Sequence, residues 1–504
     1  GNAFTQTSQQ FFCIDGKFWN VTIDTTTAQH GTRMYAALTI VNNFTNPGTG
    51  ASYLGYGTTG YTLTTPTTFS TRGQILGNVS TASAVVFNGT TAQTFSCAPS
   101  SLLGSVTMNN AAGVTITPSV INYGLNLTKG TLNCPTGTLT FGDATANTFT
   151  FVKGFGNVTT STAPAFNLTS MTANYTLNDT VALTGTAINN LFPPIISGSF
   201  TLNNSKGLTL TKNLKVGTLA LTAGKINTST NVLTVTGTAA TAITGYSATN
   251  FINGTLARAL PASTVNTGSW VYPVGTVSAA ADTILYNPFT IINPSTGTTP
   301  YIKVTVMKGN FAGSAGAYLQ SVNTDRRWNV VLDSGVFNYS RVMLYDTNIN
   351  STKLMARSTT VNGSFTGLLG TLGTFTYTSL DSLTTIAPFY YAIGLKNPMS
   401  YVSSTTTQTV TGLVSPGTTN QQILGIQVVT LGSANPLVLS QINLNANGTT
   451  NVTGDITNVR LFSTGTSATF ATTNCIDSTM NFNGTSFNVN PSIVYPFYFT
   501  EGVN

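Results

Sequence analysis

A thirty-residue segment occurs twice in this chain, and this repeat constrains the fold more than any other feature. Residues 104–133 align without a gap with residues 198–227, at an offset of 94 positions. Apolar and hydroxyl residues alternate within each copy, a period of two that is typical of strands, and Gly and Asn-Asn mark turns between them. Identical residues stand at Gly104 and Gly198, Asn110 and Asn204, Gly113 and Gly207, Leu125 and Leu219, Leu127 and Leu221, Gly130 and Gly224, and Asn133 and Asn227.

Self-similarity at a fixed offset indicates a repeat architecture in which each unit buries its apolar face against the next. Short strands, Thr-rich faces and Asn/Gly corners favour a β-solenoid, in which several coils of roughly 20–30 residues fit into one offset. A pair of tandem sandwich domains is the alternative. The solenoid predicts buried leucines and exposed threonines at equivalent positions: Leu125, Leu219, Leu127 and Leu221 inside, Thr128 and Thr222 outside.

Composition agrees with an all-β fold. Apolar residues make up 41% of the 504 residues and charged residues 6%, while Thr, Ser, Asn and Gly supply the polarity that favours strands and turns. No apolar run approaches the roughly 20 residues that span a bilayer, so we expect no membrane span. The first residue, Gly1, suggests that a signal peptide has been removed, which predicts a secreted or cell-surface protein. The net charge of +7 comes from scattered Lys and Arg, so nucleic acid is not an expected partner.

The sequence contains few of the side chains on which catalytic sites depend. His30 is the only histidine and Glu501 the only glutamate. A catalytic triad would depend on His30, but the residues around it are more typical of a turn. No nucleophile-elbow motif occurs in the sequence. The four cysteines lack metal-ligand spacing. We therefore predict no enzymatic activity, no metal and no cofactor.

Four regions follow from the pattern along the chain. Residues 1–240 form the solenoid-like repeat region, and residues 241–396 form a β-sandwich domain. Residues 397–407 are a Pro/Ser/Thr linker without apolar periodicity. Residues 408–504 form an Ig-like sandwich domain.

Several segments resemble secreted surface proteins of Bacteroidota. VVFNGTTAQTF (85–95) and LALTAGKINTSTNVLTVTG (219–237) are similar to the repeat regions of those proteins. Phe251–Arg258 and Tyr272–Gly275 resemble the β-domain that follows the repeats there, although Thr255 stands where that family often has Pro. The resemblance implies secretion and a repeat fold, but no particular activity.

The last domain carries the most specific resemblance. Residues 419–474 resemble the small sandwich domain that accompanies sialidase-like repeat proteins. In that family a segment like Thr500–Asn504 precedes a further aromatic strand, which the resemblance implies is missing here. The expected consequence is an open, apolar sheet edge, a natural place for strand addition. The alternative is that the sequence stops before the domain does.

The first strand-forming segment is the predicted partner of that edge. It is aromatic and free of helix signals, and its predicted assembly residues are Phe11, Phe12, Ile14, Phe18 and Trp19. Three cysteines lie in the repeat region and one in the last domain, an odd number on each side that suggests intermolecular pairing. We predict disulfides Cys97–Cys134 within the solenoid and Cys13–Cys475 between neighbouring copies. A head-to-tail contact that does not close generates a fibre.

Asn-x-Ser/Thr sequons are frequent, only modestly above the number that so much Asn, Ser and Thr would give by chance, and glycans on some of them are expected. The candidates are Asn20, Asn43, Asn78, Asn88, Asn126, Asn157, Asn167, Asn174, Asn178, Asn203, Asn227, Asn253, Asn338, Asn350, Asn362, Asn447, Asn451 and Asn483.

Three functions are compatible with these features. The first is a structural protein, the subunit of an extracellular filament or surface layer, whose partners are other copies of itself. The second is an adhesin or carbohydrate-binding module for surface glycans, with Trp19, Trp270 and Trp328 as candidates to stack on sugar rings, although tryptophan is more often a core residue. The third is a fragment of a larger sialidase-like enzyme, which rests on the last domain alone.

Overall fold

The computed structural model describes residues 84–97, 101–145, 147–276, 286–380, 382–446, 448, 450–480, 497–500 and 502–504. It also gives the backbone of nine strands within the first 76 residues and of β47 (Phe487–Asn488). The chain is 52% strand and 3% helix, which confirms the all-β prediction. Its helices in these parts are short: α1 (Thr186–Asn189), α2 (Val452–Asp455) and the 3-10 turn η1 (Ala240–Ala242). No helix in the described ranges is long and apolar enough to cross a membrane.

The chain forms two compact units. Unit 1 comprises Gly1–Met307, Trp328–Leu344 and Ser382–Pro388. Unit 2 comprises Lys308–Arg327, Tyr345–Asp381 and Phe389–Asn504.

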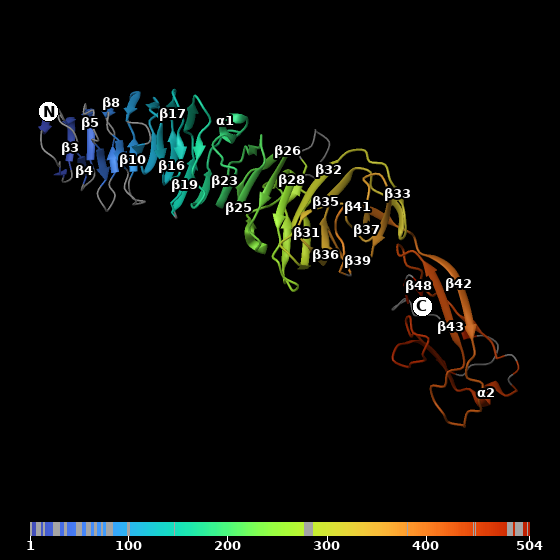
Figure 1. The fold of residues 1–504 in the computed structure, drawn as a ribbon. Coiled ribbons are helices and arrows are strands. Elements are labelled where there is room, and N and C mark those ends of the chain that lie inside the picture. Colours follow the sequence, from blue (N-terminus) through green and yellow to red (C-terminus); the bar gives the residue numbers. More distant parts are fainter. Residues whose placement is uncertain are drawn as a thin grey trace. The chain divides into compact units, whose positions relative to one another are not determined.

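Unit 1 is built on a β-solenoid of about nine turns at residues 84–275 (Figure 1). Its strands stack in parallel rows, each strand pairing with the equivalent strand of the next turn. The first row contains β7 (Thr62–Thr64), β10 (Ala84–Phe87), β13 (Ser105–Asn109), β16 (Gly124–Lys129), β19 (Thr148–Lys153), β22 (Thr172–Leu177), β23 (Ile195–Asn203), β25 (Leu214–Ala223) and β27 (Ile243–Thr244).

Two further rows complete the turns. The second contains β8 (Thr68–Thr71), β11 (Gln93–Ser96), β14 (Val114–Ile116), β17 (Thr131–Cys134) and β20 (Asn157–Thr160), and later turns add β24 (Leu208–Thr209), β26 (Ile226–Val235), β28 (Ile252–Ala259) and β30 (Val274–Gly275). The third contains β2 (Phe12–Cys13), β4 (Gly31–Met34), β6 (Tyr53–Tyr56), β9 (Gln74–Leu76), β12 (Ser101–Leu102), β15 (Ser119–Ile121), β18 (Thr140–Phe141) and β21 (Ala165–Phe166). Parallel pairing also joins β1 (Ala3–Gln6), β3 (Gly16–Ile23) and β5 (Leu38–Asn46).

The repeat offset corresponds to four turns of the solenoid. Val106 pairs with Leu125, Leu125 with Phe151, Phe151 with Tyr175, and Tyr175 with Phe200. Phe200 stands 94 positions after Val106, so the two sequence copies occupy equivalent places four turns apart. Parallel pairing continues past residue 240, the predicted end of the repeat region, to β30.

Burial follows the predicted alternation. Leu125, Leu219, Leu127 and Leu221 are all 1% exposed or less, whereas Thr128 and Thr222 are exposed. These positions confirm the repeat prediction side chain by side chain. Aromatic residues fill the turns between the two copies, with the rings of Phe151 and Tyr175 stacked at 4.9 Å between centroids.

The corners that follow β13 and β23 are equally well repeated. Asn110 and Asn204 are buried, and each side-chain amide donates to a main-chain carbonyl of the preceding turn, at 2.7 and 2.8 Å. Their side-chain oxygens each accept an N–H two residues ahead, at 2.9 Å in both copies. Buried amides in such a place must satisfy their hydrogen bonds, which explains why the Asn recurs. Gly130 recurs because its φ is +81° and an added Cβ would lie 1.7 Å from the Asn110 carbonyl oxygen.

After the solenoid, unit 1 changes to antiparallel pairing. β28 pairs antiparallel with β32 (Tyr301–Lys308), and β31 (Phe289–Thr296) lies between β29 (Ser269–Tyr272) and β36 (Phe337–Tyr345). Arg258 is fully buried at this change, where its guanidinium donates to the carbonyls of Val271 and Ala239 at 2.8 Å each. Burial lowers the pKa of this guanidinium. Trp328, on β35 (Arg326–Ser334), packs in the core of unit 1.

Unit 2 begins around a second buried arginine. Arg327 lies over the rings of Phe311 and Phe365, and its guanidinium donates to the carbonyls of Ala312 and Val361. The strands here are β33 (Ser314–Ala315), β34 (Leu319–Val322), β37 (Lys353–Ser358), β38 (Ser364–Leu368), β39 (Gly370–Gly373), β40 (Thr376–Ser379) and β41 (Phe389–Lys396). The last part contains β42 (Ser400–Thr407), β43 (Gly425–Leu431), β44 (Asn443–Leu444), β45 (Asn458–Phe462), β46 (Cys475–Met480) and β48 (Gly502–Val503).

Candidate functional site

The predicted assembly strand lies inside a paired sheet. β3, which contains Phe18 and Trp19, pairs in parallel with β1 on one side and β5 on the other. Phe12 belongs to β2, which pairs with β4. Phe11 and Ile14 lie outside the described residues. Donation of β3 to another molecule would therefore require its detachment from two neighbours, whereas β1 has one partner among the described strands.

The C-terminal sheet is the counterpart surface. β43 pairs antiparallel with β42 and β48, and Val428 exchanges two backbone hydrogen bonds with Asn504 at 2.8 and 3.0 Å. All eight residues of β42 are exposed, and β43 is its one neighbour within the described ranges. β42 thus presents an edge that can pair with a further strand.

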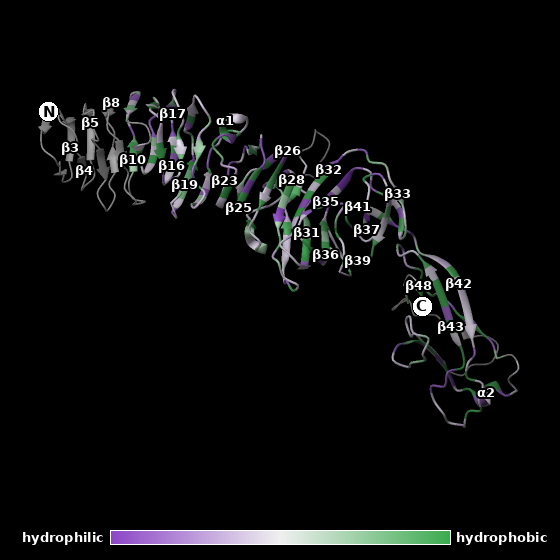
Figure 2. Ribbon diagram, in the orientation of Figure 1, coloured by the Kyte–Doolittle hydropathy of each residue, from purple (hydrophilic) through white to green (hydrophobic). Residues whose placement is uncertain are grey.

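Apolar side chains around this sheet are poorly covered. Ile423 is 64% exposed, Leu431 57% and Tyr498 55%. Among the described residues from Ser400 onward, Ala434 is the one apolar residue that is fully buried. Figure 2 shows β43 largely in the hydrophobic colour beside the pale β42. Large exposed apolar patches are a feature of interaction sites in folded proteins.

The predicted Cys97–Cys134 disulfide is wrong, because both residues are free, buried thiols. β11 and β17 are separated by β14, so these cysteines lie two strand spacings apart, roughly 9–10 Å. A disulfide needs Cα atoms less than about 7 Å apart. The Cys97 thiol instead lies 3.3 Å from the Ser119 hydroxyl, and burial raises the pKa of the Cys134 thiol.

Cys475 is free and exposed, while the side chain of Cys13 lies outside the described part of the chain. An intermolecular Cys13–Cys475 bridge stays a prediction.

Two of the three candidate sugar-stacking tryptophans are core residues, so that prediction is wrong for them. Trp270 is 4% exposed and donates its indole N–H to the Thr238 carbonyl at 2.9 Å. Trp328 is completely buried and donates to the Asn287 carbonyl at 2.8 Å. The side chain of Trp19 is outside the described residues.

Sequon asparagines of the described chain are accessible to different degrees. None is fully buried, whereas the buried asparagines, among them Asn110, Asn189 and Asn204, all lie outside sequons. Asn174 is poorly placed to carry a glycan, because its side chain is held by hydrogen bonds. Its oxygen accepts them from the Ser199 N–H and hydroxyl, at 2.8 and 2.9 Å. The exposed candidates are Asn88, Asn126, Asn157, Asn167, Asn178, Asn203, Asn338, Asn350, Asn362 and Asn451. Glycosylation of any of them stays a prediction.

Buried ion pairs account for several of the titratable groups. The Lys153 ammonium lies 2.5 Å from the Asp179 carboxylate in unit 1, and Arg326 lies 2.6 Å from Asp346 in unit 2. All four side chains are nearly inaccessible, so these pairs stabilise the fold rather than offer a reactive group. No cluster of three His, Cys, Asp or Glu side chains in the described residues could hold a metal ion.

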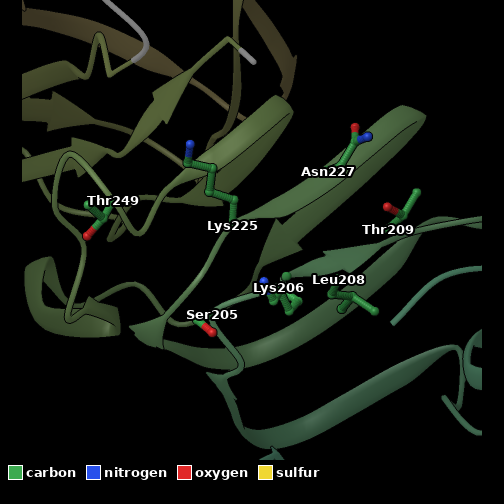
Figure 3. Close-up of a pocket in the computed structure, with 8 residues that line it drawn as sticks. Ser205, Lys206, Leu208, Thr209, Lys225, Asn227 and Thr249 are labelled. Atoms are coloured by element: carbon green, nitrogen blue, oxygen red, sulfur yellow. The ribbon is translucent and has the colours of Figure 1, made fainter. Parts of the chain in front are cut away.

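A polar groove on one corner of the solenoid was not anticipated from the sequence. It measures about 390 Å³ and is lined by three successive turns: Ser205–Thr209, Lys225 with Asn227, and Thr249 (Figure 3). Hydrogen bonds between turns fix its walls, from the Leu208 N–H to the Lys225 carbonyl at 2.9 Å and from the Ile226 N–H to the Phe251 carbonyl at 3.1 Å. The available signal was the repeat itself, which aligns Lys206 with Ala112 and Lys225 with Thr131.

Comparisons with protein-family models, with curated proteins and with solved structures find no match for this chain. The resemblance to Bacteroidota surface proteins and the Ig-like assignment of the last domain therefore stay predictions.

Proposed function

We propose that this protein is a secreted structural protein, the subunit of an extracellular filament or surface layer, in which the last domain of one copy is completed by a strand from another copy. The observation that carries this proposal is the C-terminal part of unit 2. Its edge strand β42 is exposed along its whole length, and apolar residues such as Val402, Ile423 and Leu431 are exposed around it. Addition of a strand at β42 would satisfy the backbone edge and cover apolar side chains together.

The nearly uncharged composition supports the same proposal. With 6% charged residues, the surface has few of the lysines and glutamates by which proteins keep exposed edges apart. The donor comes from the N-terminal strands, of which β1 is the outermost that the structure describes. The contact is heterologous, because an N-terminal strand meets a C-terminal sheet, and such contacts propagate into fibres.

A charged edge tests this contact. We expect Val402→Lys/Thr406→Lys to abolish polymerisation, because lysines on an edge strand oppose pairing with another strand. Both side chains are exposed, so the fold should tolerate the change. Val181→Lys/Thr184→Lys, at two exposed positions of the solenoid, is the matched control and should assemble like the wild type. Sedimentation velocity and negative-stain microscopy provide the readout, and normal filaments from the double variant would refute β42 as the acceptor.

Removal of residues 1–22 tests the donor. This deletion takes away β1, β2 and most of β3, and we expect it to leave soluble monomers with an intact C-terminal sheet. Filaments that survive the deletion would rule out donation by the N-terminal strands.

A further inference from the structure

The corner groove of unit 1 carries two positive charges that the fold does not neutralise. Lys206 and Lys225 form no ion pair among the described residues, and no carboxylate lines the groove. Of the three acidic side chains described in unit 1, Asp179 is paired with Lys153 and Asp333 with Lys303, while Asp143 accepts a hydrogen bond from the Thr145 hydroxyl at 2.6 Å. Two lysines without an acidic neighbour make the lining of this groove positively charged, which attracts anions.

One of these charges is held in place. The Lys225 ammonium lies over the buried ring of Phe251, 4.8 Å from its centroid, a cation–π contact that restricts the side chain. The neighbouring Gly224 N–H donates to the Asn250 side chain at 3.0 Å, which fixes the backbone as well. These contacts limit the freedom of the Lys225 side chain, so less conformational entropy is lost when a ligand binds to it.

The repeat shows that the solenoid does not need these lysines. Four turns earlier the same corner has the same asparagine and glycines, with Ala112 in place of Lys206 and Thr131 in place of Lys225. That copy has a single lysine, Lys129, which aligns with Ala223. The corner glycines have similar φ in the two copies, +81° at Gly130 and +86° at Gly224, so this corner forms with and without the two lysines.

We propose that this groove binds an anionic carbohydrate, a uronic-acid or sulfated oligosaccharide. Besides the two lysines, the residues that line the groove include Ser205, Thr209 and Thr249 with their hydroxyls and Asn227 with its amide. Ammonium groups suit the carboxylate or sulfate of such a sugar, and hydroxyl and amide groups suit its ring hydroxyls. No aromatic side chain lines the groove, which disfavours single-stranded nucleic acid, whose bases stack on aromatic rings. The site is independent of the β42 edge and of assembly.

Calorimetric titration of the full-length protein with an oligogalacturonate and, separately, with a heparin hexasaccharide tests the proposal. We expect binding of at least one, weakened by salt, and no binding of the neutral control maltohexaose. The Lys206→Ala/Lys225→Thr variant installs the residues of the first copy and should fold normally, as its thermal melting will show. Its affinity should fall about tenfold for each lysine removed.

Lys129→Ala is the matched control, because it removes one exposed charge from the equivalent corner of the first copy. It should leave the affinity unchanged. The proposal is overturned if neither acidic oligosaccharide binds, if the double variant binds as tightly as the wild type, or if Lys129→Ala weakens binding as much. Equally tight binding of a single-stranded oligonucleotide would also overturn it, because the site would then select charge and not sugar.

Discussion

Glycines at the solenoid corners allow a direct test of how closely the turns are stacked. Gly113 and Gly130 lie in one corner with φ of +91° and +81°, so alanine at either position would be strained by the left-handed backbone conformation. They differ in the space available. A Cβ at Gly113 would meet its nearest neighbour, the Thr131 carbonyl oxygen, at 3.4 Å, whereas a Cβ at Gly130 would lie 1.7 Å from the Asn110 carbonyl oxygen.

The expected losses of stability follow from this difference. Gly113→Ala should cost about 1 kcal/mol, which is the backbone penalty less the entropy that alanine removes from the unfolded chain. Gly130→Ala must also push two turns apart and disturb the hydrogen bonds of Asn110, at 2.7 and 2.9 Å. Each bond lost from a buried group adds ~1 kcal/mol or more, for a total of about 4 kcal/mol.

Urea denaturation followed by circular dichroism measures both variants against the wild type, and hydrogen exchange localises the loss because repeat proteins need not unfold in one step. The expected result is a large loss of protection around residues 105–134 for Gly130→Ala and a small one for Gly113→Ala. Equal losses for the two variants would refute the stacking described for this corner.

Three further predictions concern titratable side chains. Asp179→Ala should destabilise unit 1 by about 3–5 kcal/mol in thermal melting, because it leaves the Lys153 charge buried without a partner. Asp179→Asn keeps an acceptor for the Thr180 and Val181 N–H groups and should cost less stability. Equal losses of stability in the two variants would contradict this. Burial raises the pKa of Tyr377 to about 12. The contribution of the neutral phenol to the stability of unit 2 is therefore complete below the unfolded pKa of about 10 and is lost as pH rises toward 12. The pH midpoint of alkaline unfolding should be higher in Tyr377→Phe, and an unchanged midpoint would refute this. In the native protein a thiol reagent should label Cys475 rapidly and the buried Cys97 and Cys134 slowly. Peptide mass spectrometry can follow the labelling, and rapid labelling of Cys134 would contradict its burial.

The repeat made much of unit 1 predictable. Periodicity of two and a fixed offset identified the inward leucines and the outward threonines, because a strand in a stacked turn has one face inside and one outside. Burial of Asn110 and Asn204 was not predicted, since a polar side chain inside the solenoid depends on carbonyl groups of the turn before it. Those carbonyls can be located only when the register between turns is known.

Errors arose where distance between turns decides the outcome. Counting cysteines suggested a Cys97–Cys134 disulfide, but the number of strands between them sets their separation, and that number is not visible in sequence spacing. Aromatic composition suggested exposed tryptophans, whereas Trp270 and Trp328 find carbonyl partners for their indole N–H groups inside unit 1. No sequence pattern links Lys206 with Lys225, because they stand 19 positions apart and only the stacking of turns brings them to one groove.

Assembly of the purified full-length protein is the most direct test of the proposed function. Negative-stain microscopy of a concentration series, with sedimentation velocity on the same samples, should show filaments or an ordered layer that grow with protein concentration. Dispersed monomers at the highest concentration, with the C-terminal sheet folded, would contradict the proposal that another copy completes it.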